Sequence, residues 1–87
     1  MNNDLNARVT LLLALNECLP CGMTRSLILQ EVALRRKDVP RDKYPAAIDY
    51  LLANGLITAA RRNLDAAQLV YTITEEGIRR LEQEGLA

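Results

Sequence analysis

The sequence lacks the residue types on which most catalytic and metal sites depend. The chain of 87 residues contains no histidine, tryptophan or phenylalanine, and only two cysteines. Without histidine, neither a Ser-His-Asp nor a Cys-His arrangement for nucleophilic catalysis can form, and no glycine-rich phosphate loop is present. Zinc would need two further ligands beside the cysteines. The sequence therefore predicts a protein that is not an enzyme and that holds no metal ion or cofactor.

Long apolar runs are also absent. No stretch approaches the roughly 18 consecutive apolar residues that a membrane-spanning helix requires. The first eight residues, MNNDLNAR, lack the basic region and apolar segment of a secretory signal. We therefore expect no membrane partner and a cytoplasmic location, in which the two cysteines are reduced.

The apolar residues that are present are ordinary in number but narrow in type. They make up 49% of the chain, and leucine, alanine, isoleucine and valine account for nearly all of them, which suits packed helices. The length predicts a single domain, residues 1–87, that buries only about 60–65% of its extended surface. We expect its stability to be modest or to be supplemented by self-association.

Hydrophobic periodicity, glycine and proline divide the chain into four helices and one hairpin. Leu69, Tyr71 and Ile73 occupy alternate positions, and this period of two is typical of a half-buried strand. Thr74 is placed to cap the final helix, and Gly55 to stop the third. The predicted helices cover residues 5–18, 24–37, 41–54 and 75–83, and the predicted strands cover residues 56–61 and 67–74.

The first predicted helix is apolar on nearly all sides. Its middle is a run of five apolar residues, Leu11, Leu12, Leu13, Ala14 and Leu15. One buried face of a helix cannot hide five consecutive residues, so the helix must be covered on more than one side. In a domain this small, we expect the second side to be covered by another subunit. The pattern therefore predicts a homodimer that forms through this helix.

The order of these elements resembles a winged helix-turn-helix. The segment YTITEEGIRRLEQEG, residues 71–85, is similar to the second wing strand and following helix of PadR- and MarR-type bacterial transcriptional regulators. The resemblance covers residues 24–85, and small members of this kind are common among phage and prophage products. It implies a mainly α fold with a three-helix core, a two-stranded β-hairpin wing and a C-terminal helix. It also implies binding of duplex DNA and regulation of transcription.

In these regulators the helix before the wing lies in the major groove, and the wing reaches the phosphates or the minor groove. Carried over to this sequence, the helix over residues 41–54 reads the bases and the turn over residues 61–65 is the wing. On the outward face of that helix, Lys43, Ala46 and Tyr50 are the candidate contacts to DNA. The candidate phosphate contacts around it are basic: Arg35, Arg36, Lys37, Arg41, Arg61 and Arg62.

The charges of the chain balance in number but not in position. The formal net charge is zero, yet residues 23–62 hold eight basic and four acidic residues. This surplus favours salt-dependent binding to phosphates. Asp42 and Asp49 on the same helix would face a polyanion, and they keep a second hypothesis open. In that hypothesis the winged helix is a protein-interaction module that docks through its first helix and its acidic C-terminal region.

The two cysteines form a Cys-x-x-Cys motif, Cys18 and Cys21. Cys21 lies just before a predicted helix N-terminus, a setting in which reactive thiols are found. Three interpretations stay open: small apolar residues at a helix end, a redox-sensitive pair that makes the protein a thiol-based sensor, and zinc shared between two chains.

Overall fold

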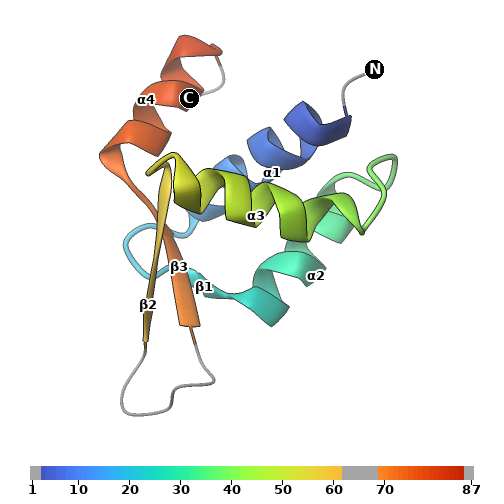
Figure 1. Ribbon diagram of the computed structural model, residues 1–87, viewed down its shortest axis with the longest axis horizontal. Helices are drawn as coiled ribbons and strands as arrows, with labels where there is room; N and C mark the ends of the chain where they lie inside the picture. The colour runs from blue at the N-terminus through green and yellow to red at the C-terminus, as the bar shows by residue number, and fades with distance from the viewer. Residues whose placement is uncertain (1–2, 62–68, 86–87) are drawn as a thin grey trace.

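The computed structural model describes residues 3–61 and 69–85, with Arg61 described by its backbone alone. Within these ranges the chain is mainly helical and carries a small three-stranded antiparallel sheet (Figure 1). In chain order the elements are α1 (Asn3–Glu17), β1 (Met23–Thr24), α2 (Arg25–Arg35), α3 (Lys43–Ala53), β2 (Ile57–Arg61), β3 (Leu69–Ile73) and α4 (Glu75–Gln83). No helix among the described residues has the length and apolar character needed to cross a membrane.

The predicted helices are all present, and their boundaries lie within two residues of the predicted ones. α2 begins after Thr24, whose hydroxyl accepts a hydrogen bond from the Leu27 N–H at 3.4 Å, and it ends at Arg35. α3 begins two residues later than predicted, because the chain first makes a turn in which the Lys43 N–H donates to the Pro40 carbonyl at 3.1 Å. α4 has the predicted boundaries.

The sheet contains one strand more than the predicted hairpin. β2 and β3 pair in antiparallel register as expected, but the prediction of only two strands is wrong. β1 pairs with the other side of β3, with Met23 opposite Tyr71, so the strand order is β1-β3-β2. A strand of two residues is too short to show alternation in a sequence. Gly22 precedes it with a φ of 77°, and a Cβ there would lie 2.6 Å from the Tyr71 carbonyl oxygen, so glycine is required.

α1 lies at the centre of the domain, where α2, α3, α4 and β3 all contact it. Figure 1 shows it behind α3, with the other helices around it. Leu11 and Leu15 are 0% exposed, Leu12 is buried as well, and Leu13 is partly buried against the same core. The burial expected from a second subunit is therefore provided by the chain itself. The homodimer stays a prediction, but Leu11 and Leu15 have no exposed surface to offer it.

Gly55 ends α3 as the sequence predicts. Its φ is +71°, the left-handed conformation that glycine adopts without strain. The Gly55 N–H donates to the Leu52 carbonyl at 3.2 Å, and the Leu56 N–H donates to the Leu51 carbonyl at 3.0 Å. These two bonds are the Schellman pattern that satisfies the last carbonyls of a helix. The chain thereby turns from α3 into β2.

Thr74 caps α4 and ties it to the end of α3. Its hydroxyl accepts from the Gly77 N–H at 3.1 Å and donates to the Gly55 carbonyl at 2.7 Å. Its own N–H donates to the Leu56 carbonyl at 3.1 Å. Gly77 is buried against Leu56, the residue that precedes β2, and any Cβ on Gly77 would overlap the Leu56 carbonyl oxygen. The cap expected from the sequence therefore also connects the start of α4 to the residues that follow α3.

Candidate nucleic-acid interface

α3 has one buried face and one exposed face, as its periodicity of about 100° per residue predicts. The buried face consists of Tyr44, Ala47, Ile48 and Leu51. Leu52, which the same periodicity places on that face, is only half-buried, whereas Ala47 is buried. The exposed face is made of small and acidic side chains: Ala46, Asp49 and Ala53.

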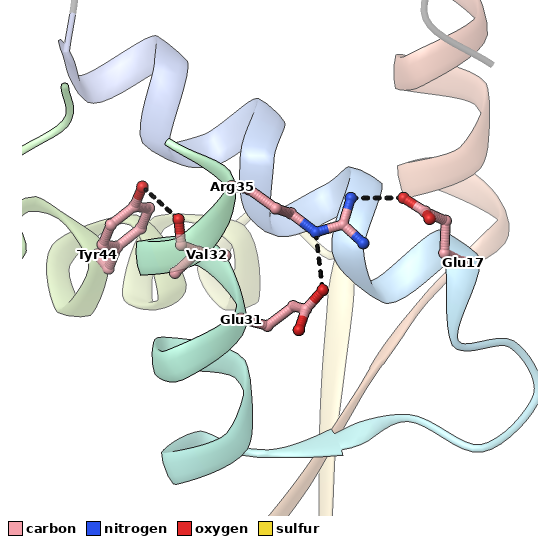
Figure 2. A network of polar contacts seen from close by, with 5 residues as sticks. All are labelled: Glu17, Glu31, Val32, Arg35 and Tyr44. Atoms are coloured by element: carbon pink, nitrogen blue, oxygen red, sulfur yellow. Dashed lines mark hydrogen bonds and ion pairs between the residues drawn. The ribbon is translucent and has the colours of Figure 1, made fainter. Parts of the chain in front are cut away.

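Tyr44 fixes the position of α3 against α2. Its hydroxyl donates to the Val32 carbonyl at 3.4 Å, a contact that Figure 2 shows from close by. The side chain is 1% exposed, and this burial raises the pKa of the phenol above its usual value of 10.0. The two helices of the predicted helix-turn-helix are therefore held together by a buried aromatic side chain and its hydroxyl group.

The sequence places Tyr50 on the outward face of α3, but in the structure its side chain does not project freely into solvent. It is half-buried, and the Arg8 guanidinium lies 3.6 Å from the centre of its ring. A guanidinium stacked on an aromatic face makes a favourable cation–π contact. Arg8 comes from α1, so sequence reasoning missed it, because nothing local links residues so far apart along the chain. Its position places a cation beside α3 that the predicted set of contacts did not contain.

Arg35 is engaged by two carboxylates. Its Nη1 lies 2.5 Å from the Oε2 of Glu17 on α1, and its Nε donates to Glu31 at 3.1 Å (Figure 2). The hydrogen bond with Arg35 lowers the pKa of the Glu17 carboxyl, and the same contact raises the pKa of Arg35. Of the predicted phosphate contacts, this arginine is thus occupied in joining α1 to α2.

Two further predicted contacts are also paired with carboxylates. Arg36 holds Asp38 through two hydrogen bonds of 2.9 and 2.8 Å, which lower the pKa of the Asp38 carboxyl to about 2. The Lys43 Nζ lies 3.4 Å from the Oδ1 of Asp4, across the contact between α3 and α1. A phosphate would have to replace a carboxylate at each of these cations.

Lys37 and Arg41 are exposed, and neither makes an ion pair with any residue that the structure describes. Both belong to the segment between α2 and α3, where they border the same groove as Arg36. Arg61 ends β2, at the far end of the hairpin from α3, and Arg62 lies outside the described residues. Of the predicted phosphate contacts, the structure thus brings Arg36, Lys37 and Arg41 together at one groove.

The cysteines lie at the end of α1. Cys18 is half-buried against the core, Cys21 is exposed, and both are free thiols. The Cys21 N–H donates to the Cys18 carbonyl at 2.8 Å and closes the turn between them. Among residues 3–61 and 69–85, no group of three or more histidine, cysteine or acidic side chains is arranged to hold a metal ion. The packing of Cys18 against the core agrees with the interpretation of a small apolar residue at a helix end. The redox interpretation stays a prediction.

Comparison with known proteins adds no relative. No family model matches the chain, and no significant match was found among curated proteins or solved structures.

Proposed function

We propose that the protein is a winged helix-turn-helix that binds duplex DNA and regulates transcription. The order of elements supports this proposal, since α2 and α3 are joined by a short turn and the β2–β3 hairpin follows α3 directly. In this proposal α3 is the recognition helix and the hairpin is the wing. Fold alone does not establish function, so the proposal depends on the surface of α3 and on the cations around it.

The observation that carries the proposal is the exposed face of α3, with basic residues in the segments before and after the helix. Ala46 and Ala53 are small and exposed, so they would let the helix backbone approach base edges and thymine methyl groups. Lys37 and Arg41 precede the helix, and Arg61 ends the strand that follows it. A helix in the major groove benefits from cations on both sides, because phosphates flank the groove on both sides.

The electrostatics of the site favour moderate rather than strong binding. Arg35, Arg36 and Lys43 already have carboxylate partners. Asp42 and Asp49 are exposed near the same face and would repel phosphates, although a carboxylate can accept a hydrogen bond from cytosine N4. With about five phosphate contacts from the turn, Arg8 and the wing, the log–log dependence of affinity on salt should have a slope on the order of −5.

The proposal is tested by fluorescence anisotropy of a labelled mixed-sequence duplex at salt concentrations of roughly 50 and 200 mM. We expect binding that weakens by orders of magnitude between them. Lys37→Ala and Arg41→Ala should each reduce the salt slope by about 1. Arg80→Ala is the matched control, because Arg80 is an exposed cation of α4 with no ion pair among the described residues. An equal effect of all three changes, or no binding at the lower salt, would contradict the proposal.

A second candidate function, a protein-interaction module, is favoured by the leucines of α2. Leu27 and Leu34 are 51% and 73% exposed. A phosphate backbone offers no apolar surface to cover such side chains, whereas a protein partner does. The leucines lie on α2 and the proposed base-reading face lies on α3, but Leu34 borders the same groove as Lys37 and Arg41, so the two functions share these cations.

A further inference from the structure

A groove with a volume of about 730 Å³ lies between the C-terminal half of α2, the following turn and the first turn of α3. Figure 1 shows these segments as neighbours, with the turn joining them. The apolar lining of the groove consists of Leu29, Ala33, Leu34, Val39, Tyr44 and Pro45. Leu34 projects furthest into solvent of these side chains, with 73% of its surface exposed. Its exposure leaves an apolar surface that a partner would cover favourably.

The polar lining of the groove is basic. Arg36, Lys37 and Arg41 border it together with Gln30, and no carboxylate is among the described residues that line it. Arg36 is held by Asp38, whereas Lys37 and Arg41 make no ion pair with the described part of the chain. An occupant that carries carboxylates beside its apolar side chains would therefore complement the groove in both respects.

The walls of the groove favour a helical occupant. Its lining residues come from α2, from residues 36–42 and from the start of α3, and none comes from the described strands. An extended segment placed there would bury backbone N–H and C=O groups with no strand edge to pair with. A helix satisfies its own backbone and presents apolar side chains at positions i, i+3, i+4 and i+7.

The described part of this chain does not supply such a helix. α4 is its most acidic helix, but Leu81 is 0% exposed and Ile78 packs against the core, so their side chains belong to the domain's own interior. What α4 presents to solvent is mainly charged, including Glu75, Glu76 and Glu82. The α4 of a second copy would therefore offer charge to the groove without apolar side chains, and its α2, which carries the exposed Leu27 and Leu34, has two arginines and only one glutamate.

We propose that this groove binds the apolar face of an acidic amphipathic helix from a partner protein. Leu34 packs against the apolar face of that helix, and Lys37 and Arg41 pair with its carboxylates. The site does not depend on DNA binding, but it shares Lys37 and Arg41 with the proposed phosphate contacts. An occupant of the groove therefore competes with DNA for these two cations.

The probe is a fluorescein-labelled peptide of about 15 residues with leucine at positions i, i+3, i+4 and i+7 and glutamate on the flanks. A matched peptide carries lysine in place of every glutamate. We expect the acidic peptide to bind the full chain, the lysine peptide to bind at least about tenfold more weakly, and amide NMR shifts to change at residues 29–45. Equal binding of the two peptides, or no binding of the acidic one, overturns the proposal.

Matched variants locate the site. Leu34→Asp should weaken binding of the acidic peptide by at least about tenfold, and Lys37→Glu with Arg41→Glu should do the same. The controls are Leu27→Asp and Arg25→Glu, which change an exposed leucine and an exposed cation of α2 outside the groove. Every substituted side chain is exposed, so each variant should remain folded, and circular dichroism checks this. Equal loss in the control variants overturns the proposal.

Two further measurements distinguish peptide binding in the groove from DNA binding and from self-association. Leu34→Ser, which adds no charge beside Lys37 and Arg41, should weaken peptide binding and leave DNA affinity unchanged, so failure of the groove and failure of the proposed DNA function give different results. Light scattering of the unmodified chain over a range of concentrations tests for a second copy in the groove. Self-association that Leu34→Asp removes would identify that copy as the occupant and overturn the proposal of an acidic partner.

Discussion

The two leucine-rich helices of this domain, α1 and α2, differ in where their leucines lie. Leu11, Leu12 and Leu15 of α1 are buried within the chain. Leu27 and Leu34 of α2 are among the most exposed large apolar side chains that the structure describes. α1 is contacted by three helices and a strand, whereas α2 lies at the edge and buries only Ile28 and Val32. The dense run of leucines therefore lies at the centre of the domain, and the two most exposed leucines among the described residues lie on α2.

The largest expected effect tests this difference directly. Leu15→Ala should lower the free energy of unfolding by about 2–5 kcal/mol, because it leaves a cavity in a fully packed site. Leu34→Ala should change it by less than about 0.5 kcal/mol, because the side chain is mostly in water. Urea denaturation of both variants measures the two values. Similar losses in the two variants would mean that the contrast between the helices is wrong.

A smaller effect is expected at the start of α2. Thr24→Ala removes the hydroxyl that accepts from the Leu27 N–H. Because a lost N-cap leaves a helix donor without its partner, we expect a loss of about 1 kcal/mol in the free energy of unfolding. Thr24→Ser keeps the acceptor and is the control. Urea denaturation measures both variants. If Thr24→Ser lowers the free energy of unfolding as much as Thr24→Ala does, Thr24 stabilises the fold by packing against the sheet and not by capping α2.

The link between the two helices is expected to contribute less. Arg35→Gln removes the contacts with Glu17 on α1 and with Glu31 on α2. All three side chains are partly exposed, so the loss should be at most about 1 kcal/mol and should shrink as salt rises. Arg79→Gln, which breaks the exposed pair with Glu76, is the control for a salt bridge within one helix. A loss that is independent of salt would argue for packing by the arginine stem instead.

The smallest expected effect is a pH dependence that comes from Asp38, just after the end of α2. Arg36 lowers the pKa of the Asp38 carboxyl from 3.8 to about 2 in the folded protein. A carboxyl whose pKa is lower in the folded state stabilises the fold fully above pH 3.8, and this contribution is lost as the pH falls towards 2. Carbon NMR titration should find the midpoint near 2 in the wild type and a midpoint raised towards 3.8 in Arg36→Gln, in which the backbone hydrogen bond to Asp38 still lowers the pKa. An unchanged midpoint in the variant would show that Arg36 is not the cause.

The elements that could be predicted from the sequence are those with local signals. α4 has the predicted boundaries, and Thr74 caps it, because the cap, the acidic first turn and the apolar spacing all lie within a few residues. The stop at Gly55 was predictable for the same reason. β1 was not, because its two residues form a strand only by pairing with β3. The place of Arg8 over Tyr50 was not predictable either, since the two residues meet across α1 and α3.

The candidate site likewise combines features that have local sequence signals with features that depend on contacts between distant residues. The sequence identified the basic residues between α2 and α3 and the outward position of Ala46. It did not reveal which cations are already paired, because Glu17 lies 18 residues from Arg35 and Asp4 lies farther still from Lys43. The sequence predicted that a second subunit covers the leucine run of the first helix, whereas Leu11, Leu12 and Leu15 are covered within the chain, because periodicity reports how much of a helix must be covered but not what covers it.

The sequence by itself determined the type and order of the helices, the hairpin and the turns, since these depend on caps, glycines and periodicities that act over a few residues. Only the tertiary structure decided that Leu11, Leu12 and Leu15 of α1 are covered by the chain itself and that Leu34 is exposed at the edge of a basic groove. The tertiary structure also decided which cations keep no carboxylate partner among the described residues. These outcomes depend on contacts between residues far apart in the chain, and they define the surfaces with which this protein meets DNA or a partner in the functions proposed for it.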